Sequence, residues 1–260
     1  FFTVFDWFLD KVSIYIKFDF LVKKCYNCGM KLYIVATPIG NLGDITLRAL
    51  DILKSVNVIF CEDTRVSAKL LKHYDIKTPT LSYHQHSSIG KIDFLLDKLA
   101  SVEASALITD AGTPGISDPG NLFIESVLAR FGSDCEIIPI PGPSALISLL
   151  SVSGLPTDKF LFLGFLPHKK GKETMLKKIL ESKETVIFYE STHRIIKTLE
   201  KITSLMPGGA DNHRRFVIGR ELTKKFETIY RGNINQVLEK IKKDSFKGEF
   251  VVVVEGNRNN

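Results

Sequence analysis

Acidic side chains and arginines stand together in three short stretches of this sequence: EDTR at 62–65, YESTHR at 189–194 and RE at 220–221. Carboxylates and imidazoles can remove a proton from a weak nucleophile. Five side chains are therefore candidate general bases: Glu62, Asp63, Glu190, His193 and Glu221. Guanidinium groups in the same stretches could hold phosphate through paired hydrogen bonds: Arg65, Arg194 and Arg220. Each stretch has an ordinary alternative, namely a helix cap, a surface turn or an internal ion pair.

Three loops rich in glycine and proline form a second set of candidates: TPIGNLGD (37–44), DAGTPGISDPG (110–120) and PIPGPSA (139–145). Their glycine spacing matches neither the G-x-G-x-x-G of dinucleotide-binding folds nor the G-x-x-x-x-G-K-[ST] of P-loops. Proline has no N–H, so these loops suit a ligand that meets carbonyl oxygens and bare backbone. A sulfonium cation beside an adenosine moiety fits that description. The alternative is three tight turns at the edge of a sheet.

The elements that must position these loops alternate between short apolar strands and amphipathic helices. We predict strands at 32–36, 57–61, 80–82, 105–109 and 135–140, with a helix after each. Asp44 is expected to cap a helix that buries Leu47, Leu50 and Leu53, and Asp118 to cap one with Pro119 in its first position. This alternation indicates a mostly parallel sheet, whose ligands lie beyond the carboxyl ends of the strands. The three loops should therefore line one crevice.

The second half of the chain predicts an α+β lobe with a mixed sheet. Strands are expected at 160–165, 185–189, 216–219, 226–230 and 249–255, and helices at 172–181, 192–206 and 234–243. The predicted fold is a two-lobed α/β structure, with lobes at 30–153 and 156–256.

Residues 1–29 are rich in Phe, and we expect Met30 to be the natural start and residues 1–29 an appendage. An amphipathic segment at a membrane surface is the alternative.

Charge is divided unevenly along the 260 residues, whose net charge is +6. Residues 30–155 contain 10 Lys and Arg against 13 Asp and Glu, whereas residues 156–260 contain 21 against 13. This asymmetry favours a polyanion that meets the second half, with a solubilising surface as the alternative.

The sequence contains no run of about 18 uncharged apolar residues, so no membrane span is predicted. The four cysteines suggest no disulfide framework, which favours a reducing cytoplasm. The pairs Cys25 and Cys28, and His84 and His86, lack further ligands nearby, so no metal site is predicted.

The motifs TPIGNLGDIT (37–46), EDTR (62–65), DAGTPGISDPG (110–120) and PGPSAL (141–146) resemble those of the tetrapyrrole methylase superfamily, and more narrowly those of the ribosomal small subunit methyltransferase I family. YESTHRI (189–195) and GRELTKKFE (219–227) extend the resemblance, which covers residues 30 to about 256. It implies the class III methyltransferase fold, a homodimer, and S-adenosylmethionine bound between two lobes without a metal. It implies methyl transfer to the ribose 2′-oxygen of a cytidine in 16S ribosomal RNA.

Residue by residue, the resemblance implies cofactor contacts in each glycine loop and in the second lobe: Pro38, Ile39, Gly40, Asp110, Gly112, Thr113, Pro114, Ile116, Gly142, Pro143, Gly219 and Phe250. The basic second half then becomes an RNA-binding candidate, through Lys169, Lys170 and Lys172 together with the three arginines already named. Two other interpretations stay open. One is a superfamily methylase that acts on a tetrapyrrole, for which a basic lobe has no use. The other is a non-catalytic RNA-binding assembly factor.

Overall fold

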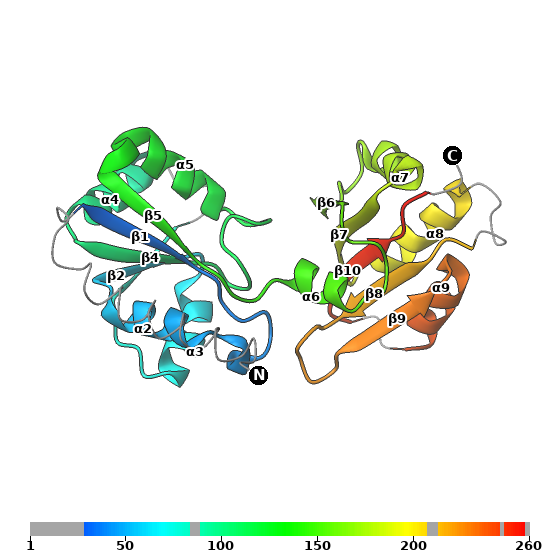
Figure 1. The fold of residues 1–260 in the computed structure, drawn as a ribbon, viewed down its shortest axis with the longest axis horizontal. Coiled ribbons are helices and arrows are strands. Elements are labelled where there is room, and N and C mark those ends of the chain that lie inside the picture. Colours follow the sequence, from blue (N-terminus) through cyan, green and yellow to red (C-terminus); the bar gives the residue numbers. More distant parts are fainter. Residues whose placement is uncertain (1–28, 84–88, 207–212, 245–246, 258–260) are drawn as a thin grey trace, which may run out of the picture.

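The structure is a computed structural model, and it describes residues 29–83, 89–206, 213–244 and 247–257. The chain forms two lobes, each built on a five-stranded sheet with helices packed against it (Figure 1). The two-lobed α/β fold is as predicted. Residues 1–28, with the CxxC pair, and the histidines at 84 and 86 lie outside the described residues. Within the described residues, every helix is too short or too polar to cross a lipid bilayer.

The first sheet is entirely parallel, with the strand order β3-β2-β4-β1-β5. Its strands are β1 (Met30–Val35), β2 (Val58–Cys61), β3 (Thr80–Ser82), β4 (Ala104–Ile108) and β5 (Cys135–Ile140). Alternate residues of β2 point to opposite faces, Ile59 and Cys61 to one core and Val58 and Phe60 to the other. Both faces are therefore buried, which explains why the strands are apolar throughout.

Two helices cover each face of this sheet. Helices α2 (Leu47–Ser55) and α3 (Thr64–His73) pack on one face, and α4 (Ile89–Ala100) and α5 (Gly120–Phe131) on the other. Short 3-10 turns stand at Leu42–Asp44 and Gly132–Asp134. These crossover helices hold the parallel strands in register, so the carboxyl ends of β4, β1 and β5 lie side by side.

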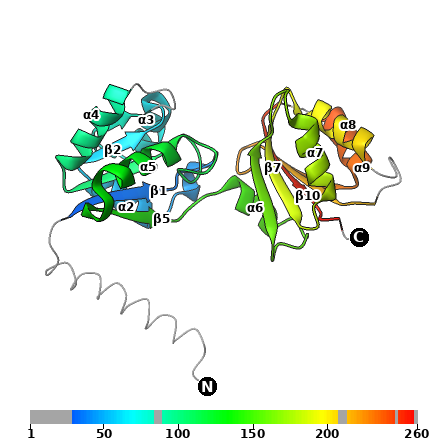
Figure 2. The ribbon, with the colours of Figure 1, turned by 90° about the horizontal axis from the view of Figure 1, so that it is seen from above.

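The second sheet is mixed, with the order β6-β7-β10-β8-β9. Strand β6 (Phe160–Phe165) runs parallel to β7 (Thr185–Ser191), while β10 (Glu249–Val254), β8 (Phe216–Arg220) and β9 (Thr228–Gly232) pair antiparallel. Helices α7 (Lys172–Glu181), α8 (Ile195–Leu205) and α9 (Ile234–Lys243) cover the face away from the first lobe (Figure 2). Helix α6 (Ala145–Ser151), which follows the first sheet in the chain, packs on the opposite face. The proposed lobe limits of 30–153 and 156–256 stay a prediction.

Two helix starts differ from the prediction. Thr46, not Asp44, caps α2, and its side chain accepts from the Ala49 N–H. Asp44 belongs to the preceding 3-10 turn. The helix begins later than predicted, so Leu47 is 81% exposed rather than buried. Helix α5 has Pro119 as its N-cap instead of Asp118, although the Asp118 carboxylate still accepts from the first helical N–H, that of Gly120.

Candidate functional site

The three glycine loops follow the adjacent strands β4, β1 and β5, and backbone contacts join them. Thr37, just after β1, exchanges two hydrogen bonds with Gly112, at 2.9 and 3.0 Å. The Thr37 hydroxyl donates to the Thr109 carbonyl at 3.0 Å. The Thr113 hydroxyl donates to the Pro143 carbonyl at 3.2 Å. The prediction that the loops share one edge of the sheet is therefore confirmed.

Glycine is needed at two points of this junction. Gly112 has a φ of +86°, a left-handed conformation that costs other residues energy. A Cβ on Gly142 would lie 3.0 Å from the Ala36 Cβ, so a side chain there would push the third loop away from β1. The loop at 110–120 is closed by Asp118, whose carboxylate accepts from the N–H groups of Gly115 and Gly120 at 2.9 and 2.7 Å. These constraints explain the glycines without requiring any ligand.

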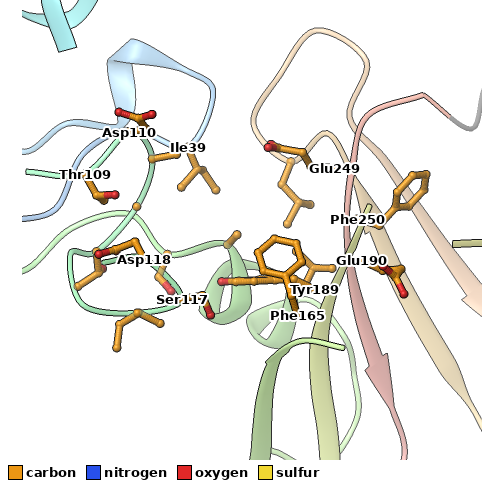
Figure 3. A pocket seen from close by; sticks show the side chains of 18 of the residues that line it. Ile39, Thr109, Asp110, Ser117, Asp118, Phe165, Tyr189, Glu190, Glu249 and Phe250 are labelled. Carbon is orange, nitrogen blue, oxygen red and sulfur yellow. The ribbon is translucent and has the colours of Figure 1, made fainter. Parts of the chain in front are cut away.

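A cavity of about 250 Å³ opens between the two lobes at these loops (Figure 3). The first lobe contributes residues from the ends of β2, β4 and β1 and from the start of α6: Ile39, Glu62, Thr109, Asp110, Ala111, Gly112, Thr113, Ile116, Ser117, Asp118, Ser144 and Ala145. The second lobe contributes residues from β6, β7, β10 and the β8–β9 loop: Phe165, Tyr189, Glu190, Leu222, Lys224, Glu249, Phe250 and Val251. A site between lobes at the carboxyl edge of a parallel sheet is a common place for a ligand.

The wall from the first lobe is acidic. Glu62 is held by the Thr109 hydroxyl, which donates to its Oε2 at 2.8 Å. Asp110 accepts from the Asp63 N–H at 3.1 Å. Burial, and then the neighbouring charges of Glu62 and Asp63, raise the pKa of Asp110. Because the carboxylates of Glu62 and Asp110 both line this wall, a cation would be favoured there.

Asp63 itself has the ordinary role foreseen as its alternative. It caps α3, and its Oδ1 accepts from the Arg65 N–H at 2.8 Å. The Arg65 guanidinium lies against the same carboxylate, with Nη2 2.6 Å from Oδ2. Hydrogen bonds from the Arg65 side chain and N–H lower the pKa of Asp63 to about 2. Such a weakly basic carboxylate is a poor proton acceptor.

The facing wall from the second lobe is built around Lys224. Its ammonium contacts Glu221 Oε1 at 3.0 Å and Glu249 Oε2 at 2.8 Å. Burial lowers the pKa of Lys224, but its bonds to these two carboxylates outweigh burial and raise it. Burial likewise raises the pKa of Glu221, yet the bonds from the Glu249 N–H and from Lys224 lower it overall. This wall also meets the first lobe, because Asn41 N–H donates to the Thr223 hydroxyl at 3.1 Å.

Of the predicted cofactor residues, five line the cavity from the first lobe: Ile39, Asp110, Gly112, Thr113 and Ile116. The remaining first-lobe candidates, which are Pro38, Gly40, Pro114, Gly142 and Pro143, are not among the lining residues. A Cβ on Gly40 would lie 2.3 Å from the Lys224 Cγ, so Gly40 makes room for the other lobe. Gly219 is packed inside the second sheet against Leu222 and Leu149.

Glu190 and Phe250 border the cavity through their strands, but their side chains point away from it (Figure 3). Phe250 belongs to the core beneath α7, α8 and α9. The Glu190 carboxylate is fully buried and accepts from Arg194 Nε at 2.6 Å and from the Thr198 hydroxyl at 2.7 Å. Lys172 Nζ lies 3.8 Å from it. This arrangement is an internal ion network, in which Glu190 holds the second lobe together and does not face a substrate.

The predicted RNA-binding residues fall into two groups. Lys169, Lys170 and Arg65 are exposed, as is the candidate base His193. Lys172 and Arg194 are instead engaged with Glu190, and Arg220 is buried, donating to the carbonyls of Lys247 and Phe226. These three cations are internal and are unsuited to phosphate on the surface.

Several lining residues were missed by the sequence analysis: Thr109, Ser117, Asp118, Ser144, Ala145, Phe165, Tyr189, Leu222, Lys224, Glu249 and Val251. Of those in the first lobe, all but Thr109 lie within the quoted motifs, so their positions in the loops were a usable signal. Side chains alternate between the two faces of β7, and Tyr189 points to the face opposite to that of Phe188 and Glu190. This alternation was the signal that could have found Tyr189. Lys224 and Glu249 meet only through the pairing of β8 with β10, which the sequence does not reveal.

Comparison with known proteins agrees with this geometry. Residues 31–238 match the family model described as Tetrapyrrole (Corrin/Porphyrin) Methylases. The ribosomal RNA small subunit methyltransferase I of Vibrio cholerae is 46% identical over 230 residues, which are 87% of this chain and 77% of that protein. The protein of the same name from Synechocystis is 44% identical over 226 residues, 86% of this chain and 78% of that protein.

Solved structures show the same fold at low identity. The cobalt precorrin-4 methyltransferase, a cobalamin biosynthetic enzyme, has a TM-score of 0.61 and 18% identity, and covers 89% of this chain and 98% of its own. The uroporphyrin III C-methyltransferase of Thermus thermophilus has a TM-score of 0.57 and 16% identity, and covers 86% and 96%. At these identities the likeness concerns the fold alone.

Proposed function

We propose that this chain, which belongs to the tetrapyrrole (corrin/porphyrin) methylase family and there to the ribosomal RNA small subunit methyltransferase I group, transfers a methyl group from S-adenosylmethionine to small-subunit ribosomal RNA. It is a methyltransferase. The observation that carries the proposal is the cavity between the lobes, where the three glycine loops meet the strands of the second sheet. The finer proposal is transfer to the ribose 2′-oxygen of a cytidine in 16S ribosomal RNA.

The residues of the first lobe suit the cofactor. Ile39, Gly112, Thr113 and Ile116 offer apolar and bare-backbone surface, and Asp110 and Glu62 provide negative charge. A sulfonium is a cation, so it is favoured next to this acidic wall and away from the ammonium of Lys224. The cofactor, when bound, supplies an electrophilic methyl group. We propose that these residues hold it so that this group faces the second lobe, because alignment of donor and acceptor accounts for most of such a rate enhancement.

Among the candidate bases, the geometry favours Glu62. Its carboxylate lines the cavity and is held by the Thr109 hydroxyl. Asp63 is bound to Arg65, Glu221 is bound to Lys224, and His193 is exposed outside the cavity lining. We propose that Glu62 accepts the proton of a ribose hydroxyl, a step that typically contributes roughly 10²- to 10⁴-fold to a rate.

The exposed Lys169 and Lys170 follow β6, whose last residue, Phe165, lines the cavity. We propose that they bind phosphates next to the target nucleotide. The homodimer implied by the resemblance and the cytoplasmic location favoured by the cysteines belong to this proposal as well. Sedimentation of the purified protein tests the dimer.

The test is incubation of the purified protein and tritiated S-adenosylmethionine with small ribosomal subunits, and separately with naked 16S RNA, followed by nuclease mapping of the label. Label on a 2′-O-methylcytidine supports the proposal. A parallel reaction supplies a tetrapyrrole as acceptor. Label on that tetrapyrrole but not on RNA would support the rival substrate, and tight RNA binding without label would support an assembly factor. Glu62→Gln should lose at least about 10²-fold in single-turnover rate at saturating S-adenosylmethionine. An unchanged rate would remove Glu62 from the mechanism.

A further inference from the structure

Strand β6 contains a bulge that changes where its last side chain points. Phe162 pairs with Ile187 of β7, whereas Phe165 pairs with Tyr189, so three steps on β6 face two on β7. Gly164 within the bulge has a φ of +61°, a conformation that glycine adopts without strain. Phe162 and Phe165 would point to opposite faces of a regular strand, but the extra residue brings both to the same face. Bulges next to active sites often re-aim a side chain in this way.

Both phenylalanine rings pack against Tyr189 at the cavity. The ring centroids of Phe162 and Tyr189 are 5.1 Å apart, and those of Phe165 and Tyr189 are 5.3 Å apart. Burial raises the pKa of Tyr189, so the hydroxyl stays neutral and the ring serves as apolar surface. Phe165 lies outermost, is 60% exposed and lines the cavity. Figure 3 shows the rings of Phe165 and Tyr189 together between the two walls.

The residues around Phe165 indicate the class of ligand that it contacts. On one side the bulge approaches the first lobe, since a Cβ on Gly164 would lie 3.2 Å from the Ser117 Oγ. On the other side the chain continues into the exposed cations Lys169 and Lys170. An exposed aromatic ring followed in the chain by exposed cations matches single-stranded nucleic acid, in which a base stacks on the ring and the phosphates meet the cations.

We propose that Phe165, supported by Tyr189, is the platform on which the base of the target nucleotide stacks when the nucleotide enters the cavity. The inference rests on the proposed function, because it names the part of the RNA that the same site holds. Stacking on Phe165 would replace the stacking that the base loses when the nucleotide is drawn out of the RNA strand into the cavity. Phe165 is then a substrate-binding residue that positions the ribose.

The test uses the full-length protein with small ribosomal subunits and measures kcat, KM and the dissociation constant of S-adenosylmethionine. Phe165→Ala is compared with Phe165→Tyr, which keeps an aromatic face, and with Phe165→Leu, which keeps only apolar bulk. The matched control is Phe94→Ala on α4, because Phe94 is exposed to a similar extent, 57%, and is not a cavity-lining residue.

We expect Phe165→Ala to lower kcat/KM by roughly 5- to 150-fold, the range that corresponds to one base–aromatic stack. Phe165→Leu should be similarly impaired, Phe165→Tyr should remain within about threefold of the wild type, and cofactor affinity should not change in any variant. Phe94→Ala should behave as the wild type.

Three outcomes would overturn the inference while leaving the proposed function intact: Phe165→Ala as active as the wild type, Phe165→Leu as active as Phe165→Tyr, or a loss of cofactor affinity equal to the loss of activity. A change in oligomeric state with Phe165→Ala would assign the ring to a second copy of the chain instead. If the wild type itself does not label RNA, the proposed function fails, and this inference fails with it.

Discussion

Replacement of Glu190 by Gln tests whether this residue acts on a substrate or holds the second lobe together. The carboxylate is fully buried and accepts from the Ser191 N–H at 2.9 Å, Arg194 Nε at 2.6 Å and the Thr198 hydroxyl at 2.7 Å. Lys172 Nζ lies 3.8 Å from it and also donates to the Thr198 hydroxyl at 2.7 Å. One negative charge thus compensates two largely buried cations.

The cost of Glu190→Gln can be worked out from these contacts. If the amide oxygen faces Arg194, the guanidinium donates to a neutral oxygen instead of a carboxylate, and the amide NH₂ then faces a Thr198 hydroxyl that has lost its acceptor. These two changes cost about 1 kcal/mol each. Removal of one charge from a buried pair also leaves the cations uncompensated, and such losses bring the total to about 3–5 kcal/mol. For a chain of this size the melting midpoint should fall by roughly 6–20 °C.

The assay is thermal unfolding followed by circular dichroism, together with single-turnover methylation at a temperature well below both midpoints. Glu181→Gln is the control, since Glu181 is an exposed residue at the end of α7 and its change should matter little. A midpoint within about 2 °C of the wild type, combined with a rate lowered by 10²-fold or more, would contradict the structural role and return Glu190 to the catalytic candidates.

Two further predictions concern charge at the proposed site. Lys169→Glu combined with Lys170→Glu should weaken RNA binding and reduce the slope of log K against log salt by about two, measured by titration at several salt concentrations, whereas Lys54→Glu in the first lobe should leave both unchanged. Equal salt slopes in the double variant and the wild type would refute the phosphate contacts. Asp110→Asn should raise the melting midpoint at neutral pH and weaken cofactor binding. Because the pKa of Asp110 is raised by burial and then by Glu62 and Asp63, its ionised form destabilises the folded state above that pKa. This penalty disappears as pH falls below the ordinary value of 3.8, so the two proteins should melt alike near about pH 3. If Asp110→Asn were less stable than the wild type at neutral pH, the ionised Asp110 would stabilise the folded state, contrary to this prediction.

Periodic elements were the most predictable part of this chain. Helices α7 and α9 begin and end at the predicted residues, because their apolar residues recur at helical spacing. Strand alternation also carried information that a charge count ignores. Glu190 shares its face of β7 with Val186 and Phe188, so its position among buried residues follows from the period of two. The sum of lysines and arginines in the second half cannot separate Lys169 from Lys172, which differ in burial within one short stretch.

Other features depend on contacts that no local pattern encodes. Asp44 and Thr46 are both suitable N-cap residues. Asp44 is part of the 3-10 turn at residues 42–44, so Thr46 caps α2 instead. The bulge at Gly164 is visible only in the pairing of β6 with β7. The three loops, in contrast, were brought together by topology alone, because parallel strands place their carboxyl ends at one edge.

Negative and positive charges lie at different places around the site. The wall of the first lobe carries the carboxylates of Glu62 and Asp110, whereas the edge of the second lobe leads to Lys169 and Lys170. A cationic cofactor is therefore attracted to the first-lobe wall of the cavity, and a polyanionic RNA to the exposed loop that follows β6. The two attractions differ in their response to salt, since a cofactor within the cavity is screened less than phosphates on an exposed loop. Raised salt should then weaken RNA binding while cofactor affinity changes little. If cofactor affinity fell with rising salt as steeply as RNA affinity, the cofactor would bind at the exposed surface and not within the cavity.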